Sequence, residues 1–379
     1  MRRGTFVRWG VPIAAAAVIG AAIGAGPVIA AVSGDPVLPE RSAEQLLADA
    51  VAATNKGGGP PPMSGTVQQT ASLGLPALPS GGASSPLSLL SGSHEVKVWY
   101  GAADKLRVAM PTQLNETNLI VNGGQAWYWD SATNTATKLT IKHGESGPEQ
   151  ATPLPQETDL TPQQLAGRLL ARADEHTAVR VINTAEVAGR AVYQLVLAPK
   201  ADNSLVQEIR IALDGETYVP LQVQVYAKGS AEPAYQVGFT QVTFTPPAAE
   251  NFTFTPPAGA KVEEKTLGLD EGFGKHAEER AEHARDVAGE VKAVGEGWTT
   301  VAVVPFSPSD LTGAQQQGEG GEQSAVIDNV LKSATPVSGT WGSGRLIRTK
   351  LVTALLTDDG RLLVGAVTPE EITKAAGIK

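Results

Sequence analysis

The residues HEVKVWYGAADKLRV at positions 94–108 decide the fold, because apolar and polar side chains alternate on both sides of a short turn. Val96 and Val98 alternate with Lys97 and Trp99. After the turn, Leu106 and Val108 alternate with Lys105 and Arg107. A period of two is typical of strands with one buried face. The stretch therefore predicts a β-hairpin.

The same alternation extends outward from this hairpin in both directions. Glycine-containing turns, among them Asn122-Gly123-Gly124 and Asp214-Gly215, separate the apolar runs as hairpin connections do. The predicted strands are residues 64–72, 119–121, 126–129, 137–141, 187–197, 206–213, 220–227 and 235–245. Consecutive strands joined by short turns predict an antiparallel meander.

Two helices interrupt the strands, at residues 42–53 and 161–176. Ser42 and Thr161 are their N-caps, and each has a Gln three residues later, as a capping box requires. Leu46 begins an apolar stripe on the first helix. We therefore expect an α+β fold in which a strongly curved antiparallel sheet, a half-barrel, carries the helices on its concave side and leaves an apolar hollow.

The chain has 379 residues, which is enough for two domains after a targeting segment. We expect the curved-sheet domain at residues 40–264, a charged linker or helix at 265–296, and a small C-terminal α+β domain at 297–379. The expected elements of the small domain are a strand at 299–305, helices at 324–332 and 369–376, and a hairpin that pairs 345–357 with 361–367.

Residues 1–33 predict export. Arg2, Arg3 and Arg8 precede an uncharged stretch at 11–32, which is the order of regions in a signal sequence. A cleaved signal peptide and a retained signal anchor both fit, since the stretch is long enough to span a membrane but consists mostly of Ala and Gly. In either case we expect the rest of the chain to be extracytoplasmic, either secreted or held at the cell membrane by the signal anchor.

Composition excludes several classes of function. The net charge of −9 and the scattered basic residues argue against nucleic acid. The chain has no cysteine, which excludes disulfides, thiol nucleophiles and a lipid-bearing cysteine. No catalytic motif is present, and His276, Glu279 and His283 are better explained as a charged helix than as metal ligands. We expect no catalytic residue, no metal and no cofactor.

Two segments have both a functional and an ordinary interpretation. Residues 74–93 are rich in Leu and lack regular patterning, so they predict either an apolar lid or a disordered insertion. The lid candidates are Leu75, Leu78, Leu87, Leu89 and Leu90. Trp127 and Trp129 share one face of a strand, either at the mouth of the hollow or in ordinary strand packing.

Residues 42–262 resemble actinobacterial members of the LolA/LolB lipoprotein-carrier superfamily. The resemblance is carried by Ser64-Gly65-Thr66-Val67, Val98-Trp99-Tyr100, Arg107-Val108-Ala109, Trp127-Tyr128-Trp129-Asp130, Tyr193-Gln194-Leu195-Val196-Leu197, Tyr218-Val219-Pro220-Leu221 and the run Phe252-Thr253-Phe254-Thr255-Pro256-Pro257-Ala258-Gly259-Ala260-Lys261-Val262. The segment Leu363-Val364-Gly365-Ala366-Val367-Thr368-Pro369 resembles the end of RseB/MucB proteins. The first resemblance implies a lipid or lipoprotein ligand, and the second implies a membrane-bound anti-sigma factor as partner.

The sequence therefore favours an exported, non-enzymatic binder or carrier of lipid or lipoprotein acyl chains. The alternatives are an RseB-like extracytoplasmic regulator, which binds a membrane protein partner through the C-terminal domain, and a cell-wall-linked structural protein. The candidate residues of the lipid cavity are Leu46, Val96, Val98, Leu106, Val108, Trp127, Trp129, Leu165, Leu169, Leu195, Ile209, Ile211, Leu221 and Val223.

Overall fold

The computed structural model describes residues 37–55, 59–74, 91–112, 114–142, 175–268, 291–306 and 333–378. Several predicted features lie outside these residues: the targeting segment, the lid leucines, most of the helix at 161–176 with Leu165 and Leu169, the helix at 324–332, and the charged stretch around His276 and His283. Among the helices that are described, none combines the length and the hydropathy needed to cross a membrane.

A twelve-stranded sheet forms the larger part of the structure, in the order β12-β6-β5-β4-β3-β2-β1-β11-β10-β9-β8-β7. Its strands are β1 (Met63–Ser72), β2 (Ser91–Ala102), β3 (Lys105–Pro111), β4 (Glu116–Asn122), β5 (Gln125–Asp130), β6 (Thr135–Lys142), β7 (Thr177–Val187), β8 (Arg190–Pro199), β9 (Val206–Asp214), β10 (Pro220–Ala227), β11 (Pro233–Thr243) and β12 (Lys261–Gly268). Because β1 pairs with β2 on one side and β11 on the other, it joins two antiparallel meanders.

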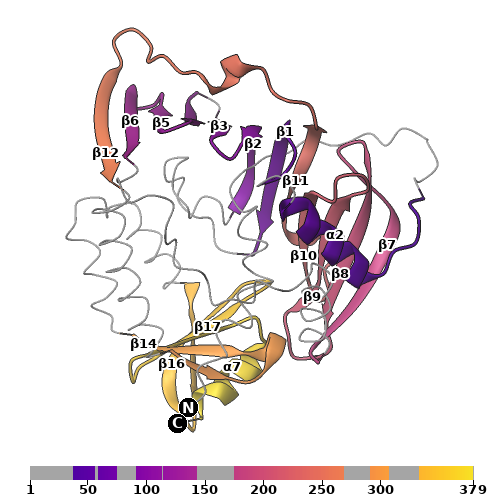
Figure 1. Cartoon of the computed structure of the whole chain (residues 1–379). Helices are drawn as coiled ribbons and strands as arrows, with labels where there is room; N and C mark the ends of the chain where they lie inside the picture. The colour runs from indigo at the N-terminus through magenta and orange to yellow at the C-terminus, as the bar shows by residue number, and fades with distance from the viewer. Residues whose placement is uncertain are drawn as a thin grey trace.

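The sheet follows an arc, from β12 at the upper left of Figure 1 to β7 at the right, and it does not close. Its register shifts between Thr66 and Val67 in the pairing of β1 with β11, and again in the pairings of β10 with both of its neighbours. Such bulges bend a strand and increase its local twist. They account for the curvature that the sequence predicted for the strands.

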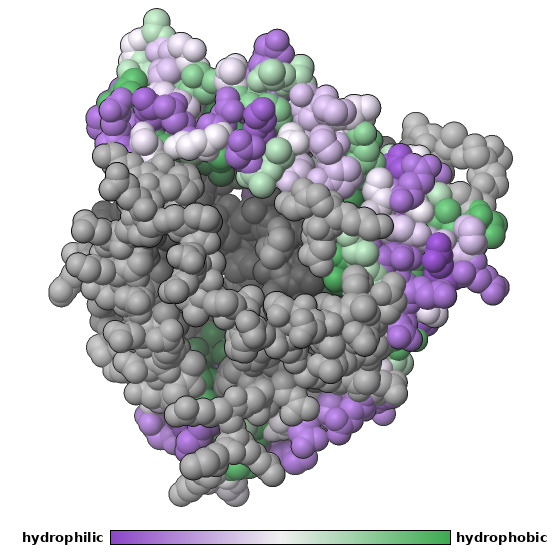
Figure 2. Space-filling model, in the orientation of Figure 1, coloured by the Kyte–Doolittle hydropathy of each residue, from purple (hydrophilic) through white to green (hydrophobic). Residues whose placement is uncertain are grey.

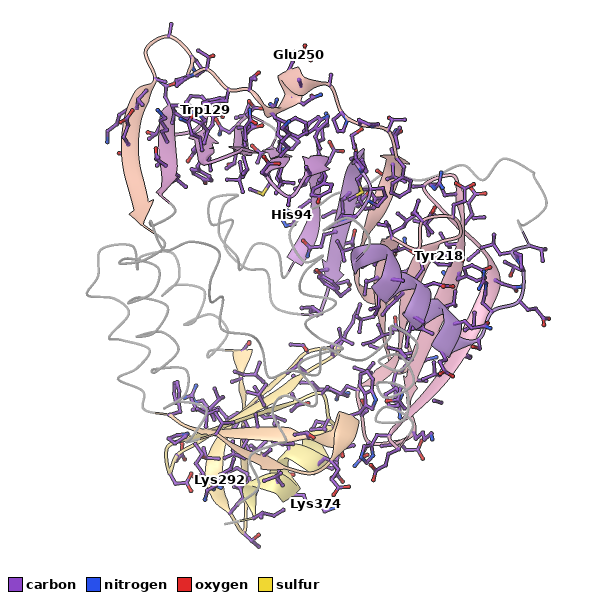
Figure 3. The ribbon with its side chains drawn as sticks, viewed as in Figure 1. His94, Trp129, Tyr218, Glu250, Lys292 and Lys374 are labelled. Carbon is purple, nitrogen blue, oxygen red and sulfur yellow. The ribbon has the colours of Figure 1, made fainter. Side chains whose placement is uncertain are left out.

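The two faces of the sheet are defined by neighbouring residues of β2. We call the face of Val98 the inner face and the face of Lys97 the outer face, since successive side chains of a strand point to opposite sides. His94 belongs to the inner face and points into the arc in Figure 3. The short helix η2 (Ala249–Phe252), which contains Glu250, lies outside the arc and contacts β3 and β4.

The first predicted helix is confirmed as α2 (Ala43–Asn55). Its capping box forms as expected: the backbone N–H of Gln45 donates to Ser42 Oγ at 3.1 Å, and the backbone N–H of Ser42 donates to Gln45 Oε1 at 3.0 Å. Leu46 is fully buried against Tyr193 and Leu213 of the sheet. The helix is thus fixed at its beginning by the cap and on one side by Leu46.

A second, six-stranded sheet has the order β13-β14-β18-β17-β16-β15 and lies below the arc in Figure 1. Its strands are β13 (Lys292–Val294), β14 (Val301–Pro305), β15 (Thr335–Gly339), β16 (Gly342–Arg348), β17 (Thr353–Thr357) and β18 (Arg361–Gly365), with η3 (Gly297–Thr299) before β14 and α7 (Pro369–Ala376) at the end. Leu355, Leu363 and Ile372 have no exposed surface and form its core.

Several predicted elements need correction. The strand expected at 187–197 begins at Arg190, because Ala188 and Gly189 form a turn, and a strand missed from the sequence, β7, precedes it. The single strand expected at 345–357 is the pair β16 and β17, which turn at 349–352 and lie antiparallel. The sheet is also mixed, because β12 runs parallel to β6.

Three other strands were absent from the prediction: β12, β13 and β15. All of β13 and half of β12 fall inside the stretch 265–296, which was expected to be a linker or helix. At the end of the helix expected at 161–176, Glu175 and His176 form a turn. The remaining strands of the predicted meander are confirmed, but they form two meanders joined by β1.

We predict that Ser42→Ala lowers the free energy of unfolding by about 1 kcal/mol, because it leaves the Gln45 N–H without its cap. Thermal denaturation measures the loss, and hydrogen exchange locates it at the amides of Gln45 and Leu46. The control is Ser338→Ala in exposed β15, which should leave both readings unchanged. Equal effects of the two substitutions would contradict the role of the cap.

Candidate functional site

Aliphatic side chains of the inner face form one continuous cluster at the centre of the sheet. Val67, Val96, Val223 and Val237 are its buried members. Its partly buried members are Val98, Val108, Met110, Ile209, Ile211, Tyr235 and Phe239. The cluster extends over β1, β2, β3, β9, β10 and β11, so both meanders contribute to it.

The pairing register extends this apolar surface toward both edges of the sheet. Val108 lies opposite Leu119 on β4, and Leu119 lies opposite Tyr128 on β5. In the other direction Ile211 lies opposite Leu195 on β8. Because directly opposed residues share a face, apolar residues extend over the inner face from β5 to β8, with Gln69 and His94 as a polar pair on β1 and β2. Most of these side chains are only partly buried.

The structure brings together most of the cavity candidates that it describes. Val96, Val98, Val108, Ile209, Ile211 and Val223 belong to the central cluster. Leu106 and Leu195 share their face by register, opposite Tyr100 and Ile211. Leu46 approaches from α2 and has Ile211 as a common neighbour with the cluster.

Three candidates lie elsewhere. Trp127 is opposite Ile120 in the register, which places it and Trp129 on the outer face, whereas Tyr128 shares the inner face with Leu119. Leu221 sits at a register shift and packs with Val192 and Ala212 in a separate cluster. These three side chains are therefore not neighbours of Val98 and Val108.

Sequence reasoning missed several members of the inner face. Met110 continues the alternation of Leu106 and Val108, and Val237 and Phe239 continue that of Tyr235. The period-two pattern contained this signal. Val67 was less visible, because it follows the bulge in β1 and its neighbours Gln68 and Gln69 are polar.

The outer face of the second meander carries a polar, internally hydrogen-bonded stretch. Glu208 is 7% exposed and accepts hydrogen bonds from Arg180 at 2.7 Å and Arg210 at 2.6 Å. Burial by itself would raise the pKa of Glu208, but these two guanidinium groups hold it below its usual value. Gln224 donates to Gln236 at 2.7 Å on the same face. Figure 2 accordingly shows many hydrophilic residues on the described surface.

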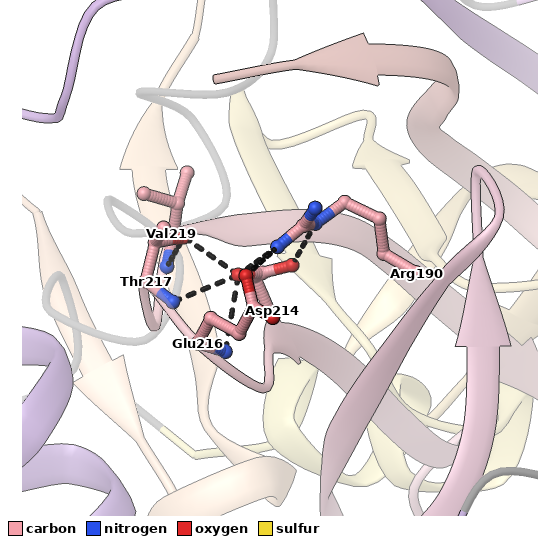
Figure 4. Close-up of polar contacts among 5 residues, drawn as sticks. All are labelled: Arg190, Asp214, Glu216, Thr217 and Val219. Atoms are coloured by element: carbon pink, nitrogen blue, oxygen red, sulfur yellow. Dashed lines mark hydrogen bonds and ion pairs between the residues drawn. The ribbon is translucent and has the colours of Figure 1, made fainter. Parts of the chain in front are cut away.

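Asp214 organises the turn between β9 and β10, beside the place where α2 packs (Figure 4). It is completely buried, forms an ion pair with Arg190, and accepts hydrogen bonds from the backbone N–H and the hydroxyl of Thr217, both at 2.8 Å. The next residue, Tyr218, has a φ of +57° and stacks on Tyr193 with ring centroids 6.5 Å apart. Tyr193 in turn contacts Leu46, so the network supports the sheet beneath α2.

Hydrogen bonds connect the two sheets at two separate places. Near β9, the backbone N–H of Leu205 donates to Ala366 O at 2.8 Å, and Trp298 Nε1 donates to Thr177 Oγ1 at 2.8 Å. At the end of β1, the backbone N–H of Lys350 donates to Leu73 O at 2.8 Å. The six-stranded sheet is thus attached both to the central strand of the arc and to its β7 end.

No family model and no curated protein sequence matches this chain. Among solved structures, the chain is similar to MucB in the MucA/MucB complex of Pseudomonas aeruginosa, with 13% identity over 87% of this chain and 94% of that chain and a TM-score of 0.39. It is also similar to a LolA superfamily protein from Nitrosomonas europaea, with 10% identity over 57% of this chain and 99% of that chain and a TM-score of 0.22.

A third similar structure is a putative outer membrane lipoprotein-sorting protein domain from Vibrio parahaemolyticus, with 12% identity over 56% of this chain and 97% of that chain and a TM-score of 0.21.

We predict that Asp214→Asn lowers the free energy of unfolding at neutral pH by about 2–4 kcal/mol, because it removes one member of a buried ion pair. Burial would raise the pKa of Asp214, but Arg190 and Thr217 outweigh it and hold the pKa below its ordinary value. The stabilisation is therefore present above the unfolded-state pKa of ~3.9 and is lost as the pH falls through the lower folded-state pKa. Urea denaturation at several pH values measures it.

The control for this prediction is Glu216→Gln, since the Glu216 side chain is 83% exposed and also pairs with Arg190. Its effect should be small at every pH. A difference between wild type and Asp214→Asn that stays constant from neutral to strongly acidic pH would contradict the assignment.

Proposed function

We propose that this protein is an exported, non-enzymatic binder or carrier of lipid or lipoprotein acyl chains, which occupy the inner face of the twelve-stranded sheet. The observation that carries the proposal is the row of partly exposed aliphatic side chains that crosses this face from β5 to β8. Apolar side chains that stay partly exposed on a concave face are typical of a ligand-binding surface.

The chemistry of the face selects an alkyl chain over a polar ligand. Val98, Val108, Ile209 and Ile211 offer only methyl and methylene surface, while the Tyr235 phenol and, at the edge of the cluster, the His94 imidazole are ionisable. Burial raises the pKa of Tyr235, so this phenol is neutral at physiological pH. Each methylene moved from water into such a site contributes about 0.8 kcal/mol, and an acyl chain of fourteen to eighteen carbons contributes on the order of 10 kcal/mol before entropy costs.

The curvature of the sheet supports the same proposal. A bent sheet surrounds a chain on more than one side, and ligand sites are concave and mostly apolar. We propose that α2 and the helix expected at 161–176 cover the inner face, with Leu165 and Leu169 facing it and the leucines at 75–90 serving as a lid. On the outer face of the second meander, Glu208, Arg210 and Gln224 form a polar, hydrogen-bonded stretch instead.

We predict that Val98→Glu abolishes palmitate binding and that Val98→Thr weakens it about fivefold to a hundredfold, because a hydroxyl is then buried without a partner. Native mass spectrometry of protein purified from its host, with and without added palmitate, measures the bound ligand. Lys97→Glu is the matched control, since this exposed neighbour points to the outer face. It should leave binding unchanged.

Two results would contradict the proposal. One is protein that carries no lipid from its host and also ignores added palmitate. The other is a folded Val98→Thr protein that binds palmitate as tightly as Lys97→Glu does.

A second function, that of an extracytoplasmic regulator with a membrane protein partner, is favoured by the connections between the two sheets. A regulator must transmit the state of its ligand site to the surface that its partner reads. Here the six-stranded sheet is hydrogen-bonded to Leu73 at the end of β1 and to Leu205 before β9, and β1 and β9 both carry inner-face residues.

For this second function we predict that palmitate changes the hydrogen exchange of the Leu205 and Lys350 amides at least severalfold, because both are held by bonds between the sheets. Exchange measured by NMR or mass spectrometry on the full chain tests it. The amide of Ile372, within α7, is the internal control. Ligand-bound protein in which Leu205 and Lys350 exchange as before would exclude signalling through these contacts.

A further inference from the structure

The segment between β11 and β12 crosses the outer face of the first meander and is anchored there. Phe252 is 4% exposed and lies over Gly101, where an added Cβ would be 3.0 Å from the ring atom Cζ. At the far end, Asn134 Nδ2 donates to Gly259 O at 3.0 Å. The segment therefore forms a fixed wall beside the β4–β5 hairpin.

A pocket of about 200 Å³ lies between this wall and the hairpin. Two opposed pairs of the register form its floor, Ile120 with Trp127 and Asn122 with Gln125, because all four side chains belong to the outer face. The wall consists of Phe252, Thr253 and Phe254. The pocket is thus separate from the inner face, on the other side of the same strands.

The lining combines aromatic rings with two exposed side-chain amides. Trp127 and Phe254 lie with ring centroids 5.5 Å apart and are tilted by 55°. At the rim, Asn122 and Gln125 are exposed, and neither side-chain amide has a hydrogen bond within the residues that the structure describes. A side-chain amide has both a hydrogen-bond donor and an acceptor. The rim can therefore accept a hydrogen bond from a ligand hydroxyl or donate one to it.

The pocket carries no net charge. Its lining has no ionisable residue. Cations border it on the same face: Lys105 lies opposite Asn122, Arg107 lies opposite Ile120, and Lys138 Nζ lies 5.9 Å from the Trp127 ring centroid. An alkyl chain would leave both amides desolvated without partners.

We propose that this outer pocket binds a saccharide, independently of the acyl-chain site. A sugar ring presents apolar C–H faces to aromatic side chains and a rim of hydroxyl groups to amides, which is the combination found here. The volume suits a single ring, so the site takes a terminal residue or one unit of a longer glycan, with the rest of the glycan in solvent.

The test is saturation-transfer NMR on the full chain with maltotriose, cellotriose, mannotriose and the trisaccharide of N-acetylglucosamine as probes. At least one probe should receive saturation, and its dissociation constant should rise about tenfold or more in the double variant Asn122→Ala/Gln125→Ala, which removes two hydrogen-bonding groups. Gln241→Ala, an exposed amide elsewhere on the outer face, should leave the constant unchanged. Both variants alter exposed side chains only and are expected to fold.

No transfer to any of the four probes would overturn the proposal. Transfer that is equal in the wild type and the double variant would overturn it as well, because the sugar would then bind elsewhere. Competition by palmitate would have the same meaning, since the two sites lie on opposite faces. Failure of palmitate binding itself would leave this result untouched, because the saccharide test uses other residues.

Discussion

The two-residue period of the strands is the constraint on which the rest of this structure depends. Successive side chains point to opposite faces, and the register keeps their parity across the sheet. Aliphatic residues such as Val98 and Ile211 are therefore gathered on one side, and Lys97 and Arg210 on the other. The bulges then bend this two-sided sheet, so that its apolar side becomes the inside of an arc.

The position of β1 explains how two meanders become one site. Each meander is local in sequence, but among the described strands only β1 hydrogen-bonds to both, and its Val67 is buried in the central cluster between Val96 and Phe239. The same strand ends at Leu73, which accepts a hydrogen bond from Lys350 of the second sheet. One strand thus links the two halves of the apolar face and the smaller sheet.

The sequence predicted what short-range patterns determine. The capping box at Ser42, the hairpin of β2 and β3 and most of the inner face follow from local spacing. The parallel pairing of β12 with β6 joins segments far apart in the chain, and no local pattern indicates it. The turn between β16 and β17 has no Gly or Pro to indicate it in the sequence. It is held instead by the Thr349 hydroxyl, which accepts a hydrogen bond from the Val352 N–H at 2.8 Å. The face of Trp127 and Trp129 was decided only by the register with β4.

The most direct test of an acyl chain on the inner face is a set of intermolecular NOEs between bound palmitate and isoleucine methyl groups of the protein. Ile209 and Ile211 lie on the inner face, whereas Ile120 and Ile182 lie on the outer face. We expect NOEs from the palmitate methylenes to Ile209 or Ile211 and none to Ile120 or Ile182. NOEs to the outer pair alone, or to none of the four, would contradict the account.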